Sequence, residues 1–265
     1  MPANLPRSAH RFAPAFTPYG PVFGLALALT LGLGACHKAD GAAATPAAVV
    51  SATPPPAGKQ WSDVTTKMAD NGMVMGNPNA PIKLEEYGSL SCPHCSKLSG
   101  EMMAPLVSGY VNTGKVSYEY HSFAIHGIDI PLTVLVRCAQ PAAFFGMVEQ
   151  VYANQDAMIQ QAMKGQAQAE AAAKLPAAQR VPAMADAYGL PQFFAARGLP
   201  VAQAQLCLAN TAAADAVAKE ADTIGASGID STPTILINGV KLSLPETEEM
   251  SWARIEPALR AAGAR

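Results

Sequence analysis

The run Cys92-Pro93-His94-Cys95 holds two cysteines separated by two residues, and such a pair either binds a metal ion or cycles between dithiol and disulfide. A structural zinc site needs four ligands, and the chain has no second Cys-x-x-Cys motif. His121 and His126 have a permitted spacing, but we interpret them as surface or loop residues at a strand end. An inert disulfide is the remaining alternative. The motif therefore predicts a redox-active pair and no metal site.

The predicted chemistry depends on a junction between a strand and a helix. Cys92 falls just before the first helical turn, where unpaired backbone N–H groups and the helix dipole favour a thiolate. Pro93 suits that turn because its missing N–H costs nothing there, and a protonated His94 would favour the thiolate further. A lowered pKa of the Cys92 thiol would make it the nucleophile and the oxidised protein a stronger oxidant. Cys95, one turn further in, is expected to be less exposed and to resolve the mixed disulfide.

The segments around the motif follow a strand-helix-strand order. Order is predicted to begin near Trp61. A largely buried strand at 82–90, a helix at 93–107 and a second strand at 115–121 form a βαβ unit. Pro105 should kink this helix or mark a join in it.

Residues 128–210 differ in composition from both flanks. Alanine, glutamine and methionine dominate, β-branched residues are few, and prolines punctuate the stretch, which predicts several helices in an all-α insert. After it we expect a helix, two strands joined by a hairpin turn, and a terminal helix, at 211–224, 234–237, 240–242 and 252–262.

The chain from about residue 74 to 265 resembles the DsbA-like branch of the thioredoxin superfamily, and its Cys-Pro-His-Cys is the same active-site tetrapeptide. The resemblance implies an α/β, thioredoxin-like fold in two parts, 61–127 and 211–265, interrupted by the all-α insert at 128–210. The residues before Cys92 are less aromatic than in the best-known members, so the partner-binding surfaces are not carried over.

Two further site elements come with this resemblance. Thr232-Pro233 precedes a predicted strand, so the proline marks a strand start or a cis turn; the resemblance implies that Pro233 is cis and that the Thr232 backbone binds the partner's chain. A buried acid is implied six positions before the first cysteine, at Glu86, where its carboxylate would assist proton transfer to or from Cys95. The alternative is a half-exposed strand charge, because neighbouring Glu85 leaves the register open.

The N-terminus has the layout of an export signal. Basic residues precede the apolar run 22–33, which is too short to span a membrane comfortably, and small residues follow, so 1–35 is predicted to be a signal peptide. Leu33-Gly34-Ala35-Cys36 resembles a lipobox, which implies lipidation of Cys36; an ordinary signal peptide is the alternative. Residues 36–60, rich in alanine and proline, are predicted to be a disordered tether. We expect a periplasmic protein anchored to a membrane through Cys36.

Five cysteines leave Cys138 and Cys207 once Cys36 and the active-site pair are assigned. In an oxidising compartment we expect them to form a structural disulfide, the alternative being two separate buried thiols. The formal net charge of −2 gives no indication of nucleic-acid binding. No cofactor is expected.

The sequence therefore predicts a DsbA-like thiol:disulfide oxidoreductase that introduces disulfides into exported proteins. Its substrates would be the thiols of those proteins, a DsbB-like membrane protein would reoxidise it, and we expect a monomer. The same chemistry could instead serve a periplasmic reductase or isomerase, although residues 37–60 are too short for the dimerisation domain of dedicated isomerases. The third possibility is a lipid-anchored carrier whose dithiol holds a metal or a partner.

Overall fold

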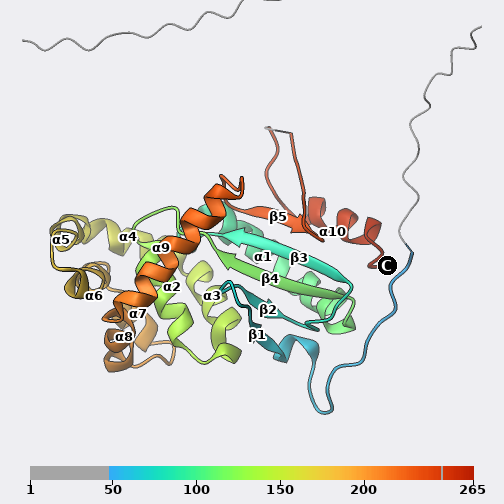
Figure 1. Cartoon of the computed structure of the whole chain (residues 1–265), viewed down its shortest axis with the longest axis horizontal. Helices are drawn as coiled ribbons and strands as arrows, with labels where there is room; N and C mark the ends of the chain where they lie inside the picture. The colour runs from blue at the N-terminus through green and yellow to red at the C-terminus, as the bar shows by residue number, and fades with distance from the viewer. Residues whose placement is uncertain (1–47, 246) are drawn as a thin grey trace, which may run out of the picture. The chain divides into compact units, whose positions relative to one another are not determined.

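A computed structural model describes residues 48–245 and 247–265 (Figure 1). The predicted signal peptide and Cys36 lie outside the described residues. Within the described ranges, none of the helices combines the length and the apolar character needed to cross a bilayer.

A six-stranded mixed sheet forms the centre of the fold, with the strand order β1-β2-β4-β3-β5-β6 (Figure 1). Only β3 and β4 run parallel, and the other neighbouring strands pair antiparallel. The strands are β1 Thr65–Lys67, β2 Met73–Met75, β3 Ile82–Gly88, β4 Val116–Ser122, β5 Thr234–Ile237 and β6 Val240–Lys241. The four predicted strands correspond to β3 to β6. The sequence did not predict β1 and β2, because three residues are too short for a periodic pattern.

The unit β3-α1-β4 positions the dithiol motif. Alternate side chains of β3 are buried, as expected for a strand with one face on the core. The helix α1, Pro93–Gly109, follows directly and packs its apolar face inward through Leu98, Met102 and Leu106. The helix does not end at Pro105, so no join occurs there.

The stretch predicted to be an all-α insert contains helices and no strand, and all its residues are described. These helices lie at one end of the sheet, whereas α9 crosses in front of it and α1 lies behind it (Figure 1). The helices after α1 are α2 Asp129–Cys138, α3 Phe144–Ala153, α4 Gln155–Lys164, α5 Gln166–Ala172, α6 Ala177–Ala187, α7 Leu190–Ala195, α8 Val201–Leu208, α9 Thr211–Ala226 and α10 Trp252–Ala261, with 3-10 turns η1 Trp61–Asp63, η2 Val111–Thr113 and η3 Pro141–Ala143.

The end of the predicted tether differs from the expectation of disorder. Residues 48–60 form no helix or strand, but they are hydrogen-bonded to the folded body. The Val50 N–H donates to the Gly263 carbonyl at 3.0 Å, and the Thr53 N–H donates to the Thr113 carbonyl at 3.0 Å. The buried indole of Trp61 donates to the Thr53 carbonyl at 2.7 Å. Composition alone does not show these backbone partners, which belong to distant parts of the chain.

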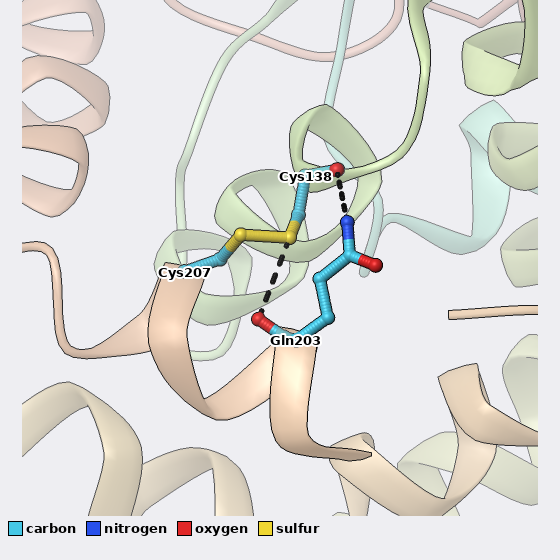
Figure 2. Close-up of a disulfide and its surroundings, with 3 residues drawn as sticks. All are labelled: Cys138, Gln203 and Cys207. Atoms are coloured by element: carbon cyan, nitrogen blue, oxygen red, sulfur yellow. Dashed lines mark hydrogen bonds between the residues drawn. A yellow bond between two sulfur atoms is a disulfide. The ribbon is translucent and has the colours of Figure 1, made fainter. Parts of the chain in front are cut away.

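Two links tie α2 to the later helices. Cys138, the last residue of α2, is joined by a disulfide to Cys207 in α8, with a Cα–Cα distance of 6.0 Å (Figure 2). Beside it, Arg137 makes a two-pronged ion pair with Glu220 of α9, at 2.8 and 2.9 Å. Together they connect α2 to α8 and α9.

Candidate active site

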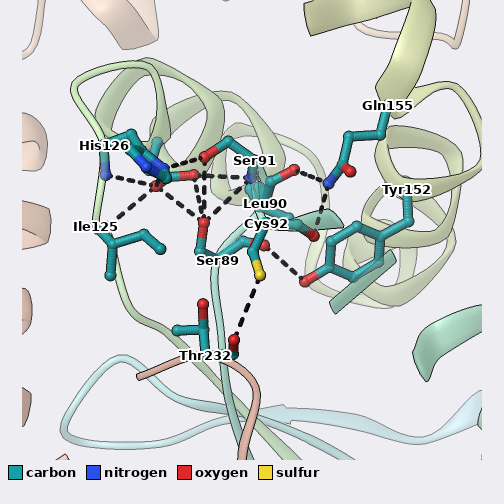
Figure 3. Close-up of polar contacts among 10 residues, drawn as sticks. Ser89, Leu90, Ser91, Cys92, Ile125, His126, Tyr152, Gln155 and Thr232 are labelled. Atoms are coloured by element: carbon teal, nitrogen blue, oxygen red, sulfur yellow. Dashed lines mark hydrogen bonds and ion pairs between the residues drawn. The ribbon is translucent and has the colours of Figure 1, made fainter. Parts of the chain in front are cut away.

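Cys92 caps the N-terminus of α1, and Pro93 occupies the first helical position. The Cys92 side chain is largely enclosed, with 4% of its residue surface exposed, and Cys95 is fully buried at 0%. Both are free thiols in this structure. When protonated, the Cys92 Sγ donates to the Thr232 carbonyl at 3.4 Å (Figure 3). Cys92 is therefore the more accessible sulfur, and Cys95 lies behind it.

The two thiols differ strongly in acidity. The pKa of Cys92 falls from 9.0 to about 5, chiefly because the Cys95 thiol hydrogen-bonds to it, with help from the Thr232 side chain and the backbone N–H groups of Cys95 and His94. Burial, followed by the same hydrogen bond, raises the pKa of Cys95. At neutral pH the reduced site therefore holds a Cys92 thiolate beside a protonated Cys95.

The His94 imidazole does not have the role that the sequence suggested. Its side chain is 60% exposed, and its Nδ1 lies 3.6 Å from a carboxylate oxygen of Glu249. That carboxylate also accepts from Lys97 at 2.7 Å. In this geometry His94 lowers the pKa of Cys92 through its backbone N–H, not through its ring.

Glu86 is fully buried at 0% exposure and lies on the face of β3 that packs against the core. Its Oε2 accepts from the Tyr118 hydroxyl at 2.6 Å, and its Oε1 has no hydrogen-bond partner among the described residues. Burial raises its pKa from 4.5 to about 7, against the lowering effect of Tyr118. The half-exposed strand charge considered as the alternative is Glu85, whose Oε1 accepts from the Gly239 N–H at 3.0 Å on the other face of the sheet.

The loop before β5 faces the dithiol. The Thr232–Pro233 peptide bond is cis, and the Thr232 carbonyl points at the Cys92 sulfur (Figure 3). Antiparallel pairing of β5 with β3 sets Thr234 opposite Tyr87, close to the end of β3. The sheet therefore brings together two segments that are 140 residues apart in the sequence.

Asp129 was not identified from the sequence, where an acidic residue in a first helical turn indicates only a helix start. It is 1% exposed. Its carboxylate accepts from the Ser89 hydroxyl at 3.0 and 3.1 Å and from the Ser91 N–H at 3.0 Å. It also accepts from the N–H groups of Ile125 at 3.1 Å and His126 at 2.9 Å. One buried carboxylate thus binds the loop before Cys92 to the loop before α2.

Two residues of the inserted helices hold the same loop from the other side. Gln155 donates through Nε2 to the carbonyls of Leu90 and Cys92, at 2.9 and 3.1 Å. The Tyr152 hydroxyl donates to the Ser89 carbonyl at 3.2 Å (Figure 3). The active-site loop is therefore fixed by hydrogen bonds before α1 begins.

The two histidines interpreted as surface or loop residues differ from each other. His126 lies in a loop with a 60% exposed side chain, and its Nδ1 is 2.9 Å from the Ser91 hydroxyl, next to the dithiol. His121 was placed wrongly, because it is 5% exposed within β4 and stacks on Tyr87 with ring centroids 4.7 Å apart. Burial by α9 and by the segment before β2 is not visible in the local sequence.

A dithiol at a strand-to-helix junction, opposite a cis-proline loop of the same sheet, defines a thioredoxin-fold dithiol protein. The family model described as Thioredoxin matches residues 68–256, and the chain belongs to this thioredoxin family. The expected α/β, thioredoxin-like fold with inserted helices is thereby confirmed.

Individual proteins agree with this assignment. The chain is 29% identical to a protein-disulfide isomerase from Novosphingobium aromaticivorans, with a TM-score of 0.66, covering 73% of this chain and 98% of that one. Wolbachia pipientis alpha-DsbA1, at 20% identity and a TM-score of 0.57 over 73% of this chain and 92% of that one, shares the fold. A Rickettsia bellii protein named "Putative protein-disulfide oxidoreductase" is 35% identical over 75 residues, which are 28% of this chain and 29% of that relative's length.

Proposed function

We propose that this protein is a thiol:disulfide oxidoreductase that donates the Cys92–Cys95 disulfide to exported proteins. The observation that carries the proposal is the contrast between a Cys92 whose pKa is lowered to about 5 and a deeper Cys95 whose pKa is raised. A low pKa makes Cys92 both the sulfur that forms the mixed disulfide and the better leaving group when that disulfide is resolved. The names of the Novosphingobium and Rickettsia proteins support the same class of reaction.

The exchange has two steps. A substrate thiolate attacks the Cys92 sulfur of the disulfide, and Cys95 leaves as a thiolate that takes up a proton. The second substrate thiolate then attacks the substrate sulfur of the mixed disulfide, which forms the substrate disulfide and releases Cys92 as a thiolate. Two electrons pass from the substrate to the enzyme, so an oxidant must restore the Cys92–Cys95 disulfide after each cycle.

Three other groups have proposed roles in this exchange. Glu86, with a pKa of about 7, can give a proton to the departing Cys95 thiolate and take it back during reoxidation. The Thr232 backbone, beside the cis Pro233, would bind the substrate chain as a short strand. The Thr232 carbonyl faces Cys92, which suits a substrate segment held across the sulfur.

The stability of the Cys92 thiolate supports the proposed direction of electron flow. At pH 7, a thiol with a pKa of about 5 stabilises the reduced form by about 2.7 kcal/mol relative to an unshifted thiol. For a two-electron couple this corresponds to a potential more oxidising by about 60 mV. A donor of disulfides needs such a shift, whereas a reductase does not.

A redox titration of the Cys92–Cys95 pair against glutathione tests the donor role. We expect a potential well above that of thioredoxin, and a value near about −270 mV would contradict the proposal. Cys95→Ser should accumulate mixed disulfides with exported proteins in cells. Cys92→Ser is the matched control and should accumulate none, because the remaining sulfur is buried.

An isomerase that is kept reduced is the second candidate, and the name of the Novosphingobium relative favours it. The redox state of the pair in cells separates the two, because a donor is found oxidised and an isomerase reduced. Trapping the state with acid and a thiol-alkylating reagent measures it. We expect the oxidised form.

The proposed location rests on the N-terminal sequence. Residues 1–35 would direct export, lipidated Cys36 would anchor the protein to a membrane facing the periplasm, and a DsbB-like membrane protein would reoxidise a monomer. Mass spectrometry of the membrane-extracted protein tests the anchor. An N-terminal peptide without lipid on Cys36 would contradict it.

A further inference from the structure

A second group of chemically active side chains lies on the sheet face opposite Glu86. Glu85 on β3 is the register partner of Glu119 on β4, and His121 follows two positions later, so that all three share one face. One oxygen of each carboxylate and one ring nitrogen lie within 4.8 Å of one another. We propose that Glu85, Glu119 and His121 bind a divalent transition-metal ion.

The charge around this group favours a cation. Two carboxylates directly opposite on neighbouring strands repel each other. Lys83 offsets part of this charge, with its Nζ 3.2 Å from a Glu119 oxygen, and Asp70 adds another carboxylate on the far side of the histidine.

The histidine supplies an independent indication of a ligand. His121 is 5% exposed and lines a surface pocket, and among the described residues its ring has the Asp70 carboxylate as a polar neighbour but makes no hydrogen bond. Stacking on Tyr87 fixes the ring plane, and its Nδ1 lies 3.8 Å from an Asp70 oxygen, beyond hydrogen-bond distance. This largely buried imidazole makes no hydrogen bond and lies next to two carboxylates, so a small movement of the side chains would let all three bind one ion.

The donor atoms select the kind of ion. One imidazole nitrogen with two carboxylate oxygens suits Zn²⁺, which binds three protein ligands and a water in tetrahedral sites. Ca²⁺ prefers six to eight oxygen ligands, which this group does not offer. Glu85 is half-exposed, so its side chain can move toward the other two ligands. This site would be separate from the dithiol, because alternate residues of β3 point to opposite faces.

Zinc binding to the oxidised protein tests the proposal, because a Cys92–Cys95 disulfide offers no thiolate to the ion. Calorimetric titration with ZnCl2 should show one saturable site. Glu85→Gln, Glu119→Gln and His121→Gln should each weaken the affinity at least tenfold. Glu170→Gln, at an exposed position of α5, is the matched control and should bind like the wild type.

Three results would overturn the proposal. These are no saturable binding of Zn²⁺, unchanged affinity in all three ligand variants, or Ca²⁺ binding as tight as Zn²⁺ binding with no effect of His121→Gln. If Glu119→Gln does not fold, Glu85→Gln still decides the outcome, since an amide oxygen can accept from the Gly239 N–H as the carboxylate does. The ring signals of His121 in an NMR spectrum give a second readout, because zinc on the imidazole should shift them.

Discussion

Replacing Glu86 with glutamine should stabilise the oxidised protein, and the gain should grow as the pH rises. Burial, with a smaller contribution from the Cys92 charge, raises the pKa of Glu86 from 4.5 to about 7 in the folded protein with free thiols. Burial is the larger cause and persists in the oxidised protein, whereas the unfolded chain exposes the carboxyl. A raised pKa means that this group's contribution to stability is complete below pH 4.5 and is lost as the pH rises through about 7. Glutamine removes the ionisation and keeps an acceptor for the Tyr118 hydroxyl.

The magnitude follows from the linkage of proton binding to folding. At about 1.36 kcal/mol per pH unit, the interval from 4.5 to about 7 corresponds to roughly 3 kcal/mol. Most of this loss develops between about pH 5 and pH 8, so the difference in unfolding free energy between variant and wild type should widen by roughly 2–3 kcal/mol over that range.

Urea unfolding of the oxidised protein at about pH 5 and about pH 8 measures this difference in unfolding free energy. The oxidised form is used because a disulfide-bonded Cys92 does not titrate, and a chelator excludes metal ions. Glu85→Gln is the matched control: it changes the neighbouring, half-exposed carboxylate on the other face and should show no such widening. A difference between Glu86→Gln and wild type that stays constant with pH would refute the reasoning.

In the reduced protein, the ultraviolet absorbance of the Cys92 thiolate should appear with a midpoint near pH 5. Cys95→Ala should move this midpoint toward 9.0, because it removes the contact that stabilises the thiolate most. An unmoved midpoint would contradict this cause. Asp129→Ala should lower the unfolding free energy measured in urea by about 3 kcal/mol or more, because several buried donors lose their acceptor. A loss below about 1 kcal/mol would show that water replaces the carboxylate. The double variant Cys138→Ala/Cys207→Ala should lose about 4 kcal/mol, as the chain-entropy model gives for a separation of 69 residues, and should keep its dithiol exchange activity. Loss of exchange in the folded variant would show that this disulfide also supports the reaction.

Features of the active site that depend on local sequence could be predicted from the sequence alone. The Cys92–Cys95 spacing can be read directly from the sequence. The strand before the pair and the helix after it are also predicted from residues that are neighbours along the chain. Proline at the first helical position and alternation along β3 act over a few residues, so pattern reasoning identifies them. The cis Pro233 needed the family resemblance as well, because a proline before a strand is compatible with either isomer.

The cause of the acidity of Cys92 could be predicted only in part. The helix N-terminus was expected to lower its pKa, and backbone N–H groups of the first turn do contribute. The largest contribution is the Cys95 thiol, and the His94 ring turns to Glu249. Glu249 is more than 150 residues further along the chain, in the segment before α10, so the motif alone could not show where the ring points.

Residue types and spacing along the chain determined the dithiol, the resolving cysteine and the strand-helix-strand unit, because those properties follow from covalent neighbours and from periods of two and 3.6 residues. The thioredoxin-like fold was expected from the family resemblance. Tertiary structure alone decided which groups surround the dithiol. Asp129, Gln155 and Tyr152 reach the active-site loop across 38 to 65 residues of sequence, and they do so because the inserted helices pack against α1 and the sheet end. A hydrogen bond requires two groups within about 3 Å of each other. For these pairs tertiary packing creates that proximity, so the local sequence pattern cannot predict it.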